Sequence, residues 1–176
     1  MKHRLLNIIL LITLTPSMAQ VSPISVDLRK IGHLAPKGRV QDKEYNPNLP
    51  IVDKLINAGP QAIPFLVSKL RDTTVIKTEV IDYWPKVCVG DVAWFILCDF
   101  FTTADWQNST IQPGVGTILE NNNQETPAWV AWDALIKKYG RNGIQKKVKN
   151  ILKPYGNNFV WDSKDLCFRP AKALGR

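Results

Sequence analysis

Apolar residues recur at helical spacing through most of the chain between residues 46 and 156. Residues three and four positions apart share one face of an α-helix, so each such stretch predicts an amphipathic helix with a buried side. Residues 92–101 carry a single charge, Asp99, which is typical of a helix at the centre of a core. The sequence therefore predicts a mainly α fold. The other apolar stripes are Ile51, Val52, Leu55 and Ile56; Ile63, Leu66, Val67 and Leu70; Trp129, Trp132, Leu135 and Ile136; and Ile144, Val148, Ile151 and Leu152.

Proline, glycine and polar capping residues predict where these helices begin and end. Asn, Asp and Thr are favoured helix caps, and proline is tolerated in a first helical turn. The first two helices are separated only by Gly59-Pro60, so we expect them to form a short antiparallel hairpin. The other predicted boundaries are Asn46-Pro47, Asp91, Thr126-Pro127, Gly140, Pro154 and Gly156.

The remaining segments lack a sustained helical period. Residues 20–45 are polar and contain proline and glycine, which predicts an extended N-terminal arm. Residues 72–88 are rich in β-branched and aromatic residues and form either a strand pair or an irregular insertion loop. The predicted organisation is thus an arm at 20–45, a helical domain at 46–156 and an irregular basic tail at 157–176.

Residues 1–19 have the layout of a signal peptide. Lys2 and Arg4 are followed by a short apolar run at residues 5–14, and Ser17-Met18-Ala19 forms a small-x-small cleavage site. The run is about half the roughly 20 residues that a membrane-spanning helix needs. We therefore expect cleavage after Ala19 and export of the mature protein, to the periplasm or to the medium.

Three cysteines follow the cleavage site, and export makes a disulfide conceivable. Cys98 lies inside the apolar helix, where we expect it to be buried and reduced. Cys88 and Cys167 lie outside the helices and are the better candidates for a bridge. Two reduced thiols at these positions are a nearly equal alternative.

The charges are segregated along the chain. Residues 20–71 have a net charge of +4, residues 72–133 one of −7, and residues 134–176 one of +9. Acidic and basic parts that pack side by side would neutralise each other. A dipolar surface that docks an acidic partner is the alternative, whereas an exported protein seldom meets nucleic acid, so we expect no nucleic-acid partner.

Two segments resemble HEAT-like repeats of the bacterial α-solenoid type. Residues 59–72, GPQAIPFLVSKLRD, are similar to the start of the second helix of a repeat, and residues 89–97, VGDVAWFIL, to the first helix of the next. The interruptions at 72–88 and 103–126 break the regular period of a solenoid. The resemblance implies a compact bundle of antiparallel helix pairs that acts as a scaffold for other proteins, and it supplies no catalytic residues.

Catalytic groups are scarce in the mature sequence. His33 is its single histidine and has no neighbouring metal-ligand pattern, so we expect no metal site and no cofactor. Carboxylates near aromatic residues, as a glycan hydrolase would use, occur in the middle of the chain. The alternative is that Asp91 caps a helix and the others face solvent. The carboxylates in question are Glu79, Asp82, Asp91, Asp99 and Asp105.

These patterns favour an exported, non-catalytic protein-binding module of the bacterial envelope. An enzyme or lectin-like module acting on envelope glycans and an inhibitor or immunity-type protein are the alternatives. We expect Trp94, Trp129 and Trp132 in the core, and Trp161 in the tail is another candidate for a binding surface. The lysines of the last helix form a solvated face or bind an anionic envelope surface. The predicted contact residues are Tyr83, Trp84, Trp106, Lys146, Lys147 and Lys149.

Overall fold

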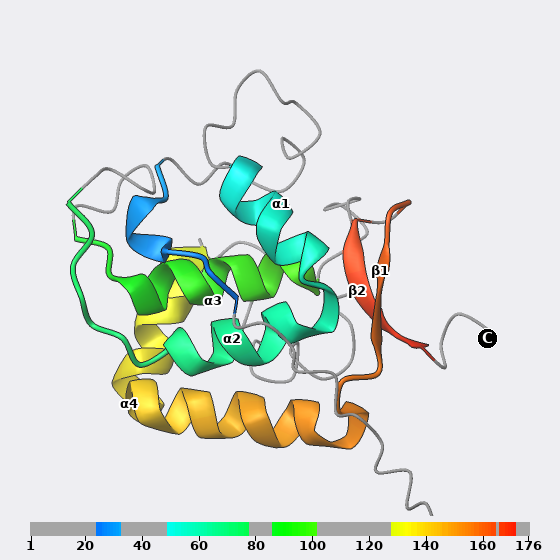
Figure 1. Cartoon of the computed structure of the whole chain (residues 1–176). Coiled ribbons are helices and arrows are strands. Elements are labelled where there is room, and N and C mark those ends of the chain that lie inside the picture. Colours follow the sequence, from blue (N-terminus) through cyan, green and yellow to red (C-terminus); the bar gives the residue numbers. More distant parts are fainter. Residues whose placement is uncertain (1–23, 33–48, 78–85, 102–127, 165, 172–176) are drawn as a thin grey trace, which may run out of the picture.

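The computed structural model describes residues 24–32, 49–77, 86–101, 128–164 and 166–171. These residues form four α-helices, three short 3-10 helices and one antiparallel pair of strands, so the fold is mainly α as predicted (Figure 1). In chain order the elements are η1 (Leu28–Lys30), α1 (Leu49–Asn57), η3 (Gly59–Gln61), α2 (Ala62–Lys69), α3 (Val89–Phe100), α4 (Ala128–Leu152), η5 (Lys153–Tyr155), β1 (Phe159–Asp162) and β2 (Cys167–Pro170).

The first two helices follow the predicted pattern. Helix α1 buries Val52 and Leu55, and its last residue, Asn57, is followed by the 3-10 turn that starts at Gly59. Helix α2 buries the apolar stripe that includes Leu66 and Val67. Beyond this connected pair, the described residues do not stack into a repeat solenoid.

Helix α3 lies at the centre of the molecule, as its nearly uniform apolar sequence predicts. It contacts α2, η1 and β2. It also reaches α4, because the rings of Trp94 and Trp132 stack with centroids 4.6 Å apart. Both indole side chains are almost completely buried, which confirms them as core residues.

Helix α4 consists of two helical segments. Gly140, at φ 64° and ψ 162°, interrupts the helical backbone, so the predicted stop at this residue is confirmed. The second segment buries Ile144 and Val148 and ends in η5, at the predicted Pro154.

The C-terminal tail is not irregular, and that prediction was wrong. Strands β1 and β2 pair antiparallel, with Trp161 opposite Phe168. Phe168 is fully buried, and its ring packs edge-on against Phe100 of α3. The aromatic residues on the strands find partners in the core, and this packing stabilises the hairpin. Trp161, considered above for a binding surface, is half-buried against the same two phenylalanines.

The described part of the N-terminal arm, residues 24–32, is not simply extended. It contains the turn η1, and Leu28 and Ile31 insert into the core with 3% and 1% of their surface exposed. In the segment 72–88, Val75 and Cys88 form an isolated antiparallel bridge. Residues 78–85 lie outside the described part, so the choice between strands and loop there stays open.

Candidate functional site

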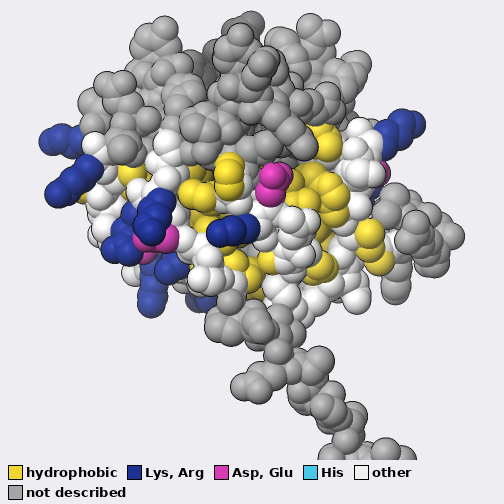
Figure 2. Space-filling model, turned by 45° about the horizontal axis from the view of Figure 1, so that its top comes forward, with side chains coloured by type: hydrophobic (Ala, Val, Ile, Leu, Met, Phe, Trp, Pro, Cys, Tyr) yellow, Lys and Arg dark blue, Asp and Glu magenta, His cyan; other side chains and the backbone are white. Residues whose placement is uncertain are grey.

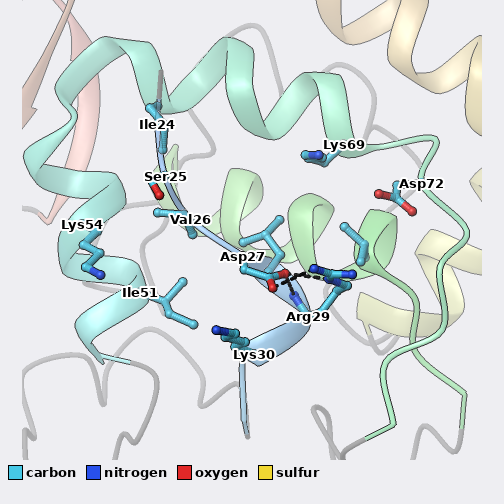
Figure 3. Close-up of a pocket in the computed structure, with 12 residues that line it drawn as sticks. Ile24, Ser25, Val26, Asp27, Arg29, Lys30, Ile51, Lys54, Lys69 and Asp72 are labelled. Carbon is cyan, nitrogen blue, oxygen red and sulfur yellow. Dashed lines mark hydrogen bonds and ion pairs between the residues drawn. The ribbon is translucent and has the colours of Figure 1, made fainter. Parts of the chain in front are cut away.

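A cavity of about 600 Å³ lies beside the arm. It is bounded by residues 24–30, by α1, and by the end of α2 with the start of α3 (Figure 3). Cavities of this volume are of the size that binds small ligands or a short stretch of a partner chain. We refer to it as the arm pocket, and its lining residues are Ile24, Ser25, Val26, Asp27, Leu28, Arg29, Lys30, Ile51, Lys54, Lys69, Asp72 and Val89.

Asp27 and Arg29 fix the shape of the arm in the pocket. The Asp27 carboxylate caps η1 by accepting a hydrogen bond from the backbone N–H of Arg29 at 3.1 Å. It also receives two bonds from the Arg29 guanidinium, at 2.8 and 2.9 Å. The bonds from the Arg29 side chain lower the pKa of Asp27 to about 2. Asp27 is therefore ionised at neutral pH, and its carboxylate is already paired with Arg29.

The carboxylate of Asp72 also has a hydrogen-bond partner within the protein. Its Oδ1 accepts a hydrogen bond from the backbone N–H of Thr74 at 3.0 Å. Partial burial raises the pKa of Asp72, but the hydrogen bonds from Thr74 outweigh that effect, so the pKa lies below its usual value.

Three lysines complete the polar lining. Lys30 and Lys54 lie on either side of Ile51, and Lys69 lies beyond the Asp27–Arg29 pair, near Asp72 (Figure 3). Four cationic and two anionic side chains line the pocket, so the lining has a net charge of +2.

The apolar part of the lining consists of half-buried aliphatic side chains, chiefly Ile24, Val26 and Ile51. Two of the cations, Lys30 and Lys54, therefore flank this aliphatic wall (Figure 3). One face of the molecule, seen in Figure 2, likewise mixes Lys and Arg side chains with hydrophobic ones, and acidic side chains are few on it. The arm pocket can attract a carboxylate and at the same time bury an apolar side chain beside it.

A second polar cluster lies inside the molecule, around Asp91. Its carboxylate accepts hydrogen bonds from the Cys88 backbone N–H at 2.8 Å, the Trp132 indole N–H at 2.7 Å and the Arg141 guanidinium. Burial raises the pKa of Asp91, but these bonds more than compensate, and the pKa stays below its usual value. Asp91 therefore caps α3, and with Arg141 it ties α3 to α4.

Cys88 adjoins this cluster. Burial, together with the negative charge of Asp91, raises the pKa of the Cys88 thiol to about 11. All three cysteines are reduced in the structure, so the candidate bridge between Cys88 and Cys167 is not formed. Cys98 is half-buried rather than fully buried.

The structure describes only three of the six predicted contact residues. Lys146, Lys147 and Lys149 are exposed on α4, as expected, and they do not line the arm pocket. Tyr83, Trp84 and Trp106 lie outside the described residues, as do His33, Glu79, Asp82 and Asp105. The indole of Trp129 is also outside the described part, and Asp99 is half-buried on α3.

Sequence reasoning missed the arm pocket, although a local signal was present. Asp27 stands immediately before Leu28 and Ile31, which are three positions apart, and an Asp before such a spacing marks a capped turn with one buried side. The pocket itself is assembled from segments far apart in the sequence, so no local pattern encodes it.

Comparison of the chain with protein-family models, with curated proteins and with solved structures found no match in any of the three. Among the described residues, no helix is long and apolar enough to cross a membrane. The same residues contain no group of three His, Cys, Asp or Glu side chains that could hold a metal ion.

Proposed function

We propose that this protein is an exported, non-catalytic binding module whose arm pocket receives an acidic segment of another protein. The observation that carries the proposal is the composition of the pocket, in which Lys30 and Lys54 flank the aliphatic side chain of Ile51 and Lys69 lies at the other end (Figure 3). A segment that alternates carboxylates with aliphatic side chains would satisfy both parts of this lining.

The state of the two pocket carboxylates supports binding over catalysis. A general base needs a lone pair within reach of the substrate and a pKa near the working pH. Asp27 is held by Arg29 with a pKa of about 2, and Asp72 is held by Thr74 with a lowered pKa. Neither carboxylate suits acid or base catalysis at neutral pH.

Two sequence features support the same proposal. The signal peptide at 1–19 predicts export to the envelope or beyond. The resemblance of residues 59–72 and 89–97 to HEAT-like repeats implies a scaffold that binds other proteins.

The test uses three labelled peptides of equal length that alternate Leu with Glu, Leu with Gln, or Leu with Lys. Binding of each peptide to the protein is measured by fluorescence anisotropy. We expect the Glu peptide to bind most tightly to the mature protein. The triple variant K30Q/K54Q/K69Q should weaken that binding by roughly a hundredfold, about 1 kcal/mol for each charge removed near the surface.

The triple variant K146Q/K149Q/K153Q is the matched control, because it removes the same charge from exposed positions outside the pocket. It should leave binding of the Glu peptide nearly unchanged. Equal binding of the three peptides, or equal weakening by the two triple variants, would remove the pocket from the proposal.

A further inference from the structure

The second segment of α4 carries a surface whose charged side chains are all positive. Between Asp133 and Asp162 the sequence contains no Asp or Glu, and all its charged residues are Lys or Arg. The lysines on this part of the helix are exposed. We call this surface the lysine face and define it as Lys138, Lys146, Lys147, Lys149 and Lys153.

Helical spacing aligns most of these charges. Lys146, Lys149 and Lys153 follow one another at i, i+3 and i+7, which places them in one stripe along the helix. Ile144 and Val148 are fully buried on the other side. The stripe therefore points away from the core.

Tyr139 joins the remaining two lysines to this surface across the break at Gly140. The Nζ of Lys147 lies 4.3 Å from the centroid of the Tyr139 ring, and that of Lys138 lies 5.1 Å from it. The lysine face thus extends over both segments of α4 and into η5.

The helix that carries these lysines is firmly held. The side-chain amide of Gln145 donates hydrogen bonds to the backbone carbonyls of Val67 and Ser68, at 2.8 and 3.1 Å. The backbone that carries the lysines is consequently already ordered, so binding does not incur the entropy cost of ordering a mobile segment.

Two other cations in the C-terminal part of the described chain have carboxylate partners. Lys137 pairs with Asp133 at 2.8 Å, and Arg169 pairs with Asp162 at 3.0 Å. In the described part of the chain, no carboxylate is paired with Lys146, Lys149 or Lys153. Within the described residues, the stripe of Lys146, Lys149 and Lys153 is therefore an array of like charges without carboxylate partners.

We propose that the lysine face binds the headgroups of an anionic phospholipid bilayer. A cluster of four to eight basic residues on one helix surface is the usual arrangement for this attraction. A protein partner would bind more readily where apolar side chains lie beside the charges, as they do in the arm pocket. On this face none of the large hydrophobic side chains among the described residues is exposed, since Tyr139 is half-buried. A flat, diffuse anionic surface is thus a better match than a shaped partner.

The two binding surfaces use different residues. The second segment of α4 lies at the opposite edge of the helical layer from α1, which contributes Ile51 and Lys54 to the arm pocket (Figure 1). Lys69, at the other end of the pocket, follows Ser68, whose carbonyl accepts a hydrogen bond from Gln145 of α4. Bilayer binding through α4 would therefore leave the α1 side of the pocket uncovered. The inference does not rest on the proposed function, and each can fail without the other.

The test is flotation of the mature protein with vesicles of phosphatidylcholine alone, or with about one third phosphatidylglycerol. We expect binding only to the anionic vesicles, with a loss of most binding between roughly 0.05 and 0.5 M salt. K146Q/K149Q/K153Q should weaken partitioning about a hundredfold, roughly fivefold for each lysine removed.

K30Q/K54Q/K69Q, which has the same net charge, is the control and should partition like the unmodified protein. Equal weakening by both triple variants would show that net charge alone drives binding and would overturn the assignment of the site. Absence of binding to anionic vesicles at low salt, or equal binding to neutral vesicles, would overturn the inference as a whole. Circular dichroism of both variants checks that the substitutions leave the fold intact.

Discussion

Gly90 occupies a position where no side chain fits. It is the second residue of α3, and its backbone N–H donates to the carbonyl of Asp72 at 2.8 Å. A Cβ at this residue would lie 2.6 Å from the Leu70 carbonyl oxygen and 2.8 Å from Nη1 of Arg141. The absence of a side chain thus allows the end of α2, the start of α3 and Arg141 to meet.

We expect Gly90→Ala to lower the free energy of unfolding by about 3 kcal/mol, because backbone atoms cannot move aside as a flexible side chain can. Urea unfolding followed by circular dichroism measures the change. Gly143→Ala is the control. The added Cβ would lie 3.3 Å from that of Tyr139, and alanine also favours the helix, so a change of less than about 1 kcal/mol is expected. Similar costs for the two variants would contradict this account of Gly90.

Asp91 shows why sequence spacing alone could not decide the role of the central carboxylates. Its position before an apolar helix predicts a cap, and the structure confirms the cap through the bond from Cys88. Its partners Trp132 and Arg141 are 41 and 50 residues away, and nothing local announces them.

The break in α4 is a feature of an element. At Gly140 the backbone adopts φ 64° and ψ 162°, a region that only glycine occupies readily. The break changes the direction of the chain directly before Arg141, whose guanidinium reaches Asp91. Two helical segments can therefore follow each other closely and still pack on different parts of the core.

Gly140→Ala should lower the free energy of unfolding by about 1–3 kcal/mol, since nothing crowds the site and the cost is backbone strain. Thermal or urea unfolding measures this value. Lys137→Ala, three residues earlier, removes only an exposed ion pair and should cost less than about 1 kcal/mol. A neutral Gly140→Ala variant would mean that the chain can continue as a regular helix.

The helices could be predicted from the sequence because their signals are local. Apolar periodicity located α1 to α4, and Gly59, Pro60, Gly140 and Pro154 marked their ends. The strand pair was missed, although Phe159-Val160-Trp161 and Cys167-Phe168 are β-favouring runs around a polar turn. Each run is short and lies in a basic tail. The hairpin is stabilised by packing on Phe100, the last residue of the distant helix α3, and on Phe101, which follows it.

The candidate site was less predictable than the fold. The lysine face follows from helical spacing, and the sequence indicated four of its five members, all except Lys138. The arm pocket depends on where Leu28 and Ile31 insert, and that is decided by the space left between helices. Tertiary packing creates this space, so sequence periodicity cannot reveal it.

At the scale of the whole molecule, ionised carboxylates stabilise the fold. The pKa of Asp91, of Asp72 and of Asp27 is lower in the folded protein than the usual value for Asp. A group whose folded pKa is depressed stabilises the protein above its unfolded pKa, and this stabilisation is lost as the pH falls through the folded value.

We expect the free energy of unfolding to change little between about pH 7 and 5 and to fall below about pH 4, near the unfolded pKa of Asp. Urea unfolding over a pH series measures this profile. Asp91→Asn should cost about 3–5 kcal/mol at neutral pH, because it leaves a largely buried guanidinium without its counter-charge. In this variant the free energy of unfolding should also fall less steeply as the pH is lowered. An unchanged slope would show that Asp91 is not a major source of the acid sensitivity.

The contacts of α4 have a consequence for how fast the chain folds. Helical proteins usually fold quickly because most of their contacts are local. Here Gln145 caps the carbonyls at the end of α2 from 78 and 77 residues away, and Arg141 neutralises Asp91 from 50. Helices α2 and α3 emerge first during synthesis but lack these partners until α4 has followed. A nascent chain that ends before α4 should therefore be open to proteases and chaperones, and folding should be slower than the helix content alone suggests.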